Sequence, residues 1–60
     1  MKTVIIEYAA IDPVTLVQKI EKAFPSAMAI YTDIDEDYFE LSVWECTDLE
    51  MLEDILAEYV

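Results

Sequence analysis

AMAIYTDIDEDYFELSVWEC, residues 27–46, contains two segments in which polar and apolar side chains alternate. Successive residues of a strand point to opposite faces of a sheet, so this alternation predicts strands over 27–34 and 38–46. The residues between them, Asp35–Asp37, are of a turn-forming type and are expected to close a hairpin. A hairpin with one apolar face needs other elements to cover that face.

The two faces of each strand follow from the positions of the apolar residues. The core face of the second strand is expected to consist of Phe39, Leu41 and Val43. Its opposite face consists of Tyr38, Glu40, Ser42 and Trp44. Hydrophobicity assigns three residues of the first strand to the core side: Met28, Ile30 and Ile34. Tyr31 and Asp33 are then expected on the uncovered side of the sheet.

An amphipathic helix is expected before the hairpin. Asp12 can cap its N-terminus, and Pro13 suits the first helical position because its missing N–H has no partner there. Pro25 ends the helix, because the residue before a proline is pushed out of helical geometry. The apolar residues recur mostly at spacings of three and four: Val14, Leu16, Val17, Ile20, Ala23 and Phe24. Residues 3–9, TVIIEYA, are rich in β-branched and aromatic side chains and predict a strand ahead of this helix.

A second helix is expected after the hairpin, running to the C-terminus. Thr47 and Glu50 fit a capping box, in which the side chain of each residue accepts a hydrogen bond from the backbone N–H of the other. The buried stripe of this helix is expected to consist of Leu49, Leu52, Ile55, Leu56 and Tyr59. Glu50, Asp54 and Glu58 lie four residues apart, so like charges stack along its exposed face, with Glu53 beside them. Each such pair destabilises a helix by a few tenths of a kcal/mol.

The order β-α-β-β-α predicts a single α+β domain over residues 1–60. Two amphipathic helices and one apolar sheet face make a two-layer sandwich, with a three-stranded, mainly antiparallel sheet and both helices on one face. We place the third strand in the middle of the sheet, and the alternative has the second strand there. The arrangement is that of a ferredoxin-like topology without its last strand.

The length of the chain limits its expected stability, and its cysteine content indicates the cellular compartment. A chain of 60 residues buries only about 60% of the surface that its unfolded form exposes, so its stability is expected to be low. The single cysteine, Cys46, cannot form an internal disulfide and is expected to fill space at a strand end. No apolar segment has the length of a signal-peptide core or the roughly 18 residues of a membrane helix. The protein is therefore expected to be soluble and cytoplasmic.

The net charge of −11 is distributed unevenly along the chain. In residues 1–22 three lysines balance three acids, whereas residues 23–60 contain no lysine or arginine. The whole net charge therefore belongs to residues 23–60. Repulsion disfavours contact of that region with nucleic acid phosphates or with an anionic membrane.

The sequence holds no candidate residues for catalysis or for a resident metal or cofactor. His, Arg and Gly are absent, which removes the usual general base, the phosphate-binding loop and the dinucleotide fingerprint. The spacing of Asp33, Asp35 and Asp37 is that of an EF-hand start, but Tyr38 and Trp44 occupy the positions that need Gly and Glu. Only weak, adventitious binding of divalent cations is expected there. We expect no enzyme activity and no cofactor.

Three aromatic residues are candidate anchors for a partner. Tyr31, Tyr38 and Trp44 are expected on the uncovered face of the sheet, where they meet water. Aromatic residues are enriched at protein interfaces, and Tyr and Trp are enriched at their hot spots. The alternatives are a partner protein, a second copy of this chain, and a purely local role in cross-strand pairs.

The acidic surface has three interpretations: a solvated face, adaptation to high salt, or recognition by a basic groove. The third is the leading hypothesis, in which a non-catalytic protein inhibits or regulates a partner by occupying a basic surface, such as one that holds nucleic acid. In size, charge and lack of catalytic parts the chain resembles the DNA-mimic and anti-CRISPR class of small phage-type proteins. The predicted partner-binding carboxylates are Asp33, Asp35, Glu36, Asp37 and Glu40 on the hairpin and Glu50, Glu53, Asp54 and Glu58 on the helix. The alternative is a structural module that forms a homodimer, or joins a larger assembly, through its uncovered sheet face.

Overall fold

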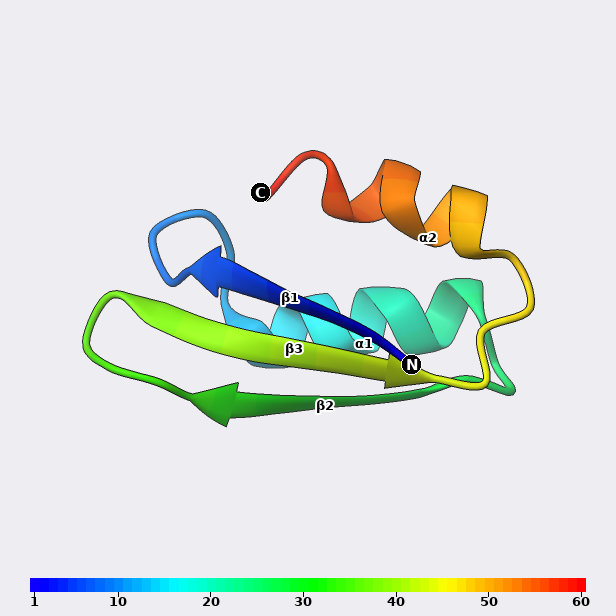
Figure 1. The fold of residues 1–60 in the computed structure, drawn as a ribbon, viewed down its shortest axis with the longest axis horizontal. Helices are drawn as coiled ribbons and strands as arrows, with labels where there is room; N and C mark the ends of the chain where they lie inside the picture. Colours follow the sequence, from blue (N-terminus) through cyan, green and yellow to red (C-terminus); the bar gives the residue numbers. More distant parts are fainter.

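The chain folds in the order β-α-β-β-α, as the sequence predicts (Figure 1). The computed structural model describes residues 1–60. Its elements are β1 (Lys2–Glu7), α1 (Pro13–Ala23), β2 (Met28–Asp33), β3 (Tyr38–Trp44) and α2 (Leu49–Leu56). Neither helix has the length and apolar content required to cross a lipid bilayer.

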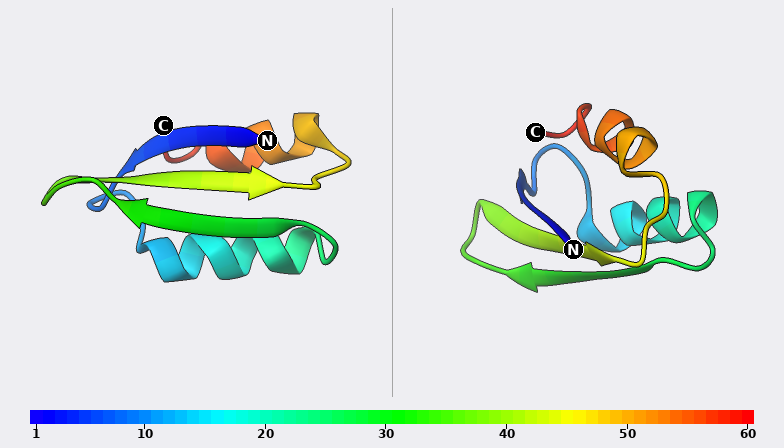
Figure 2. Two further views of the ribbon diagram at one scale, coloured as in Figure 1. Left: turned by 60° about the horizontal axis from the view of Figure 1, so that its bottom comes forward. Right: turned by 45° about the vertical axis from the view of Figure 1, so that its right-hand side comes forward.

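The three strands form one antiparallel sheet in the order β1-β3-β2. The third strand is therefore central, which confirms the placement preferred from the sequence over the alternative with β2 in the middle. Both helices lie on the same side of this sheet. In Figure 1, α1 lies behind β1 and β3 and α2 lies beyond β1, and Figure 2 shows that α1 also lies next to β2. The predicted two-layer α+β fold is confirmed.

The core lies between the sheet and the two helices. Its centre is the face of β3 that carries Phe39, Leu41 and Val43, all of which are almost fully buried as predicted. The helices and β1 complete it with Ile6, Leu16, Ile20, Leu52 and Leu56. Burying each such side chain stabilises the fold by about 1.5–3 kcal/mol, so these few residues supply most of the hydrophobic driving force.

The first helix begins and ends where the sequence predicts. The Asp12 carboxylate accepts a hydrogen bond from the backbone N–H of Thr15 at 3.2 Å, and Pro13 occupies the first helical position. Phe24 caps the C-terminus, and its N–H donates to the carbonyl of Ile20 at 2.8 Å.

The second helix differs from the prediction at both ends. Asp48, not Thr47, is the N-cap, and its carboxylate accepts a hydrogen bond from the N–H of Met51 at 3.0 Å. Aspartate caps at least as well as threonine and also favours the positive end of the helix dipole. The helix stops at Leu56 before reaching the C-terminus, where Glu58 would meet the negative end of the dipole.

The two faces of β2 are the reverse of those predicted. Ala29 is buried in the core, whereas Met28, Ile30 and Ile34 are exposed. Tyr31 lies on the covered side, with its ring against that of Phe39 at a centroid distance of 6.3 Å. The cause is the register, because β2 residues with odd numbers pair with the odd-numbered core residues of β3. A one-residue shift in pairing exchanges the two faces of a strand. The prediction assigned the faces of β2 from hydrophobicity alone and therefore placed its more apolar residues in the core.

The side of the sheet that no helix covers is called the open face below. It carries Thr3, Ile5 and Glu7 of β1, Met28, Ile30 and Thr32 of β2, and Tyr38, Glu40, Ser42 and Trp44 of β3. The outward positions of β3 are as predicted, and those of β2 are not. Asp33, like Tyr31, belongs to the covered side.

Candidate partner-binding surfaces

Two carboxylates of the acidic hairpin hold the hairpin itself in shape. The Asp35 side chain accepts hydrogen bonds from the backbone N–H groups of Asp37 at 2.8 Å and Tyr38 at 3.0 Å. An aspartate side chain can replace a backbone turn bond in this way, which closes the turn without glycine. The Asp33 carboxylate accepts a hydrogen bond from the hydroxyl of Tyr8. Asp33 and Asp35 therefore have structural partners inside the chain.

The contact with Asp33 changes the acid–base behaviour of Tyr8. The hydrogen bond to the carboxylate is the main cause that raises the pKa of Tyr8 from 10.0 to about 12, and partial desolvation and the nearby negative charge add to it. An ionised phenol would lose this bond and face a like charge. The N–H of Tyr8 also donates to the carbonyl of Asp37 at 2.9 Å, so this residue ties the end of β1 to the hairpin.

Five of the nine predicted carboxylates have no partner inside the chain. Glu36 and Asp37 lie exposed at the hairpin tip, and Glu40 lies on the open face. Glu50 and Asp54 lie exposed on α2. None of these side chains makes an ion pair, because the only pairs involve Lys2 and Lys19 with other acids. Their charge is fully available to a partner.

The two remaining carboxylates near the C-terminus are paired with lysines. Glu53 lies 3.3 Å from the Nζ of Lys2, and Glu58 lies 3.9 Å from the Nζ of Lys19. Both pairs are exposed to solvent, so each is expected to stabilise the fold by about 1 kcal/mol or less. They tie α2 and the C-terminal turn to β1 and α1, contacts between residues far apart in the sequence.

The lysines lie away from the open face. Lys2 shares the covered side of β1, as its cross-strand partner Val43 shows, and Lys19 and Lys22 belong to α1. Lys19 also donates a hydrogen bond to the hydroxyl of Tyr59 at 2.7 Å, which raises the pKa of the lysine. The open face therefore carries carboxylates and no lysine.

Two of the three predicted aromatic anchors lie on the open face. Tyr38 is directly opposite Glu7 of β1, and Trp44 is directly opposite Met28 of β2. Tyr38 is exposed and Trp44 is half-buried, so both present aromatic surface to solvent. Tyr31 lies on the covered side, where its ring meets that of Phe39 while 40% of the residue stays exposed, so the prediction that it lies on the uncovered face is wrong.

The open face is more apolar than the sequence predicts, because Met28 and Ile30 belong to it. Ile5 is 57% exposed, Met28 55% and Ile30 48%. The length of the expected turn, Asp35–Asp37, could have revealed this. A three-residue turn pairs odd-numbered residues of the first hairpin strand with odd-numbered residues of the second, and even-numbered residues with even-numbered ones. That pairing would have moved Met28 and Ile30 to the side of Trp44.

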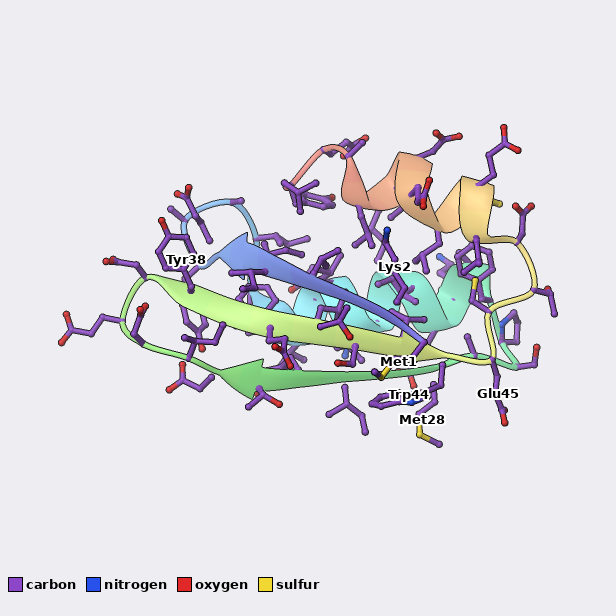
Figure 3. All side chains as sticks on the ribbon, viewed as in Figure 1. Met1, Lys2, Met28, Tyr38, Trp44 and Glu45 are labelled. Carbon is purple, nitrogen blue, oxygen red and sulfur yellow. The ribbon has the colours of Figure 1, made fainter.

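A pocket of about 300 Å³ opens at one end of the open face. Met28, Ile30, Trp44 and Glu45 line it, so three of its four residues are apolar. Figure 3 shows the labelled side chains of Met28, Trp44 and Glu45 at the same end of the sheet, with Met1 nearby. This is the only concave site in the chain, and it combines an indole ring with one carboxylate.

Glu45 has an unusual backbone conformation at the edge of this pocket. Its φ is 56°, in the left-handed region, where the chain turns out of β3 toward α2. This conformation costs a residue with a Cβ roughly 1–2 kcal/mol, and Gly or Asn adopts it more easily. The Glu45 side chain makes no ion pair within the chain.

The structure groups no set of three or more Asp, Glu or Cys side chains that could hold a metal ion. Cys46 is half-buried at the end of β3 and packs against the core. Its thiol lies 3.6 Å from the carbonyl of Asp48.

In comparisons with known proteins, no family model, no curated protein and no solved structure matches this chain. The function is therefore argued from the charges, the apolar surface and the pocket alone.

Proposed function

We propose that this chain is a non-catalytic binding protein that inhibits or regulates a partner by occupying a basic surface. A groove that normally holds nucleic acid is the kind of surface that fits, which gives the protein a DNA-mimic or anti-CRISPR-like character. The observation that carries the proposal is the segregation of charge. Residues 23–60 hold no lysine or arginine, and six of their eleven side-chain carboxylates have no partner in the chain.

The physical basis is long-range attraction followed by short-range contact. A surface with one sign of charge draws an oppositely charged partner and accelerates encounter, and this attraction falls as salt is added. Charge alone gives limited affinity, and most binding energy in interfaces comes from a few desolvated side chains, often Trp or Tyr. Trp44 and Tyr38, beside exposed aliphatic residues, can supply that contact.

The experiment is affinity capture from lysate of the source cells with matched charge variants. Glu50→Lys and Asp54→Lys each reverse an unpaired acid on α2, and Glu21→Lys makes the same change in net charge on α1. A nucleic-acid-binding protein is expected to be captured by the wild type and by Glu21→Lys, and to be released by moderate salt. Glu50→Lys and Asp54→Lys should retain several-fold less of it.

Competition makes the test specific for mimicry. Duplex DNA added to the lysate should displace the captured partner if both occupy the same basic surface. Capture that resists salt and DNA and is equal for all three variants would show that the acidic surface is not the binding site.

A second function is favoured by the apolar residues of the open face: a structural module that forms a homodimer or joins a larger assembly. Sheet-face association buries apolar area and should be indifferent to salt, or tighten as screening relieves repulsion between acidic copies. Sedimentation of the purified protein at low and high salt tests this. If the protein sediments as a monomer at all protein concentrations and at both salt concentrations, the homodimer hypothesis is wrong.

A further inference from the structure

The pocket on the open face has a composition that suits one kind of side chain. Met28 and Ile30 supply aliphatic walls, Trp44 supplies an aromatic wall, and Glu45 supplies the only charge. Lysine and arginine side chains pair a long apolar stem with a cationic head, so they can bury the stem while the head meets a carboxylate. A cation is also attracted to the face of an indole ring, the best aromatic partner for this interaction.

No lysine of this chain fills that role, and the N-terminal ammonium of Met1, at the same end of the sheet (Figure 3), forms no ion pair with Glu45. Lys2 is paired with Glu53 on the covered side, Lys19 is paired with Glu58, and Lys22 belongs to α1. Glu45 is exposed and remains without a countercharge. The Glu45 carboxylate is therefore free to pair with a cation of another molecule.

We propose that the Met28–Ile30–Trp44–Glu45 pocket binds a lysine or arginine side chain of the partner protein, with the stem against Met28 and Ile30 and the cation beside Trp44 and Glu45. This inference rests on the proposed function, because it names the residue type through which a basic partner is held at short range. It also assigns roles to Met28, Ile30 and Glu45, which the sequence did not single out.

The surroundings of the pocket favour a basic partner over a second copy of this chain. A second copy that used its own open face would bring the same carboxylates and no lysine, so Glu45 would stay unpaired. Repulsion between like-charged surfaces also opposes that contact. Access is open, because β2 forms one wall of the pocket and is an edge strand of the sheet.

The test uses the purified protein, labelled with ¹⁵N, and short peptides as probes. Four pentapeptides differ only in their central residue, which is Arg, Lys, norleucine or Glu, with alanine at the other positions. The Arg and Lys peptides are expected to shift the indole N–H of Trp44 and the amides of Met28 and Ile30. The norleucine peptide, which keeps the stem and lacks the charge, should bind roughly three- to tenfold more weakly, and the Glu peptide should cause no shift.

Two variants with the same change in charge separate the pocket from the acidic surface in general. Glu45→Asn removes the pocket carboxylate while asparagine tolerates the left-handed backbone, so the fold should be kept. Glu36→Asn removes a carboxylate at the hairpin tip. The preference for Arg and Lys over norleucine should be lost in Glu45→Asn and unchanged in Glu36→Asn.

The outcomes distinguish the two proposals. Shifts confined to the hairpin tip and α2, with Trp44 unaffected, would overturn the pocket assignment and leave the proposed function standing. Equal binding of the norleucine and Arg peptides at Trp44 would overturn it as well, since the pocket would then recognise only apolar surface. If even a pentalysine peptide caused no shift anywhere, both the pocket assignment and the proposed function would fall.

Discussion

The two faces of the sheet carry apolar side chains of similar size in different surroundings. On the covered face, Leu41 and Val43 are almost wholly buried, whereas on the open face Ile5, Met28 and Ile30 expose about half of their surface or more. A 60-residue chain has helices enough for only one face. The hydrophobic core therefore depends on one face, and the other face leaves its apolar side chains exposed to solvent. Apolar patches of this kind are typical of binding surfaces, which is why a partner is proposed for it.

The largest expected difference between the faces is in the free energy of unfolding that is lost when an aliphatic side chain is replaced by alanine. Leu41→Ala should destabilise the protein by about 2–5 kcal/mol, because it removes a fully buried side chain and leaves a cavity. The total stability of a chain this short is roughly 3–9 kcal/mol, so this variant should lose a large fraction of it and unfold at a much lower urea concentration. Urea denaturation followed by circular dichroism measures the loss.

Ile30→Ala is the matched truncation on the open face. Its cost should be about 1 kcal/mol or less, because half of the side chain is already in water. Similar losses for Ile30→Ala and Leu41→Ala would mean that the open face is covered in solution, as in a stable dimer.

A smaller effect is expected at the cap of α2, the shorter of the two helices that cover the sheet. Asp48→Ala should cost about 1 kcal/mol, because the N–H of Met51 loses its hydrogen bond to the carboxylate. Thr47→Ala should change the free energy of unfolding by less than about 0.5 kcal/mol. The same denaturation experiment decides between them, and a larger loss for Thr47→Ala would restore the capping box that the sequence suggested.

The polar contact at the hairpin end of the covered face predicts a dependence on alkaline pH. The pKa of Tyr8 is raised from 10.0 to about 12, so the folded state keeps a proton that the unfolded state releases in this window. The stabilisation is therefore complete below pH 10 and is lost as the pH rises toward 12. Denaturation between pH 9 and 12 should show this decline for the wild type, and Tyr8→Phe should show a shallower one. Identical slopes would show that the contact with Asp33 is absent in solution.

The smallest expected effect is that of salt on the stability of the free protein. Screening should increase the free energy of unfolding by on the order of 0.5 kcal/mol, the scale of surface charge interactions, because most of the surface charge is of one sign. Asp54→Asn removes an unpaired carboxylate and should weaken this dependence. Glu53→Gln breaks the pair with Lys2 and should not weaken it. A decrease of stability with salt would indicate that the two ion pairs outweigh the repulsion.

The local parts of the fold could be predicted because their causes are local. Asp12 and Pro13 specify the start of α1, and the alternation around Leu41 specifies β3, from interactions within a few residues. The prediction for α2 was off by one residue at its cap, because Thr47 and Asp48 are both good caps.

The candidate site could be predicted only in part. The exposed positions of Glu36, Asp37, Glu50 and Asp54 follow from a turn and a helix face, so composition and periodicity were sufficient. The contact of Tyr8 with Asp33 joins the turn after β1 to the end of β2, and nothing near either residue indicates it.

Sequence alone established the order of the elements, the core face of β3 and the segregation of the charge, since each depends on residue type and short-range spacing. The tertiary structure was needed for the faces of β2, the pairing of Lys2 with Glu53 and the pocket beside Trp44. The physical reason is strand register: a shift of one residue exchanges core and surface, and the pairing across the whole sheet sets that shift.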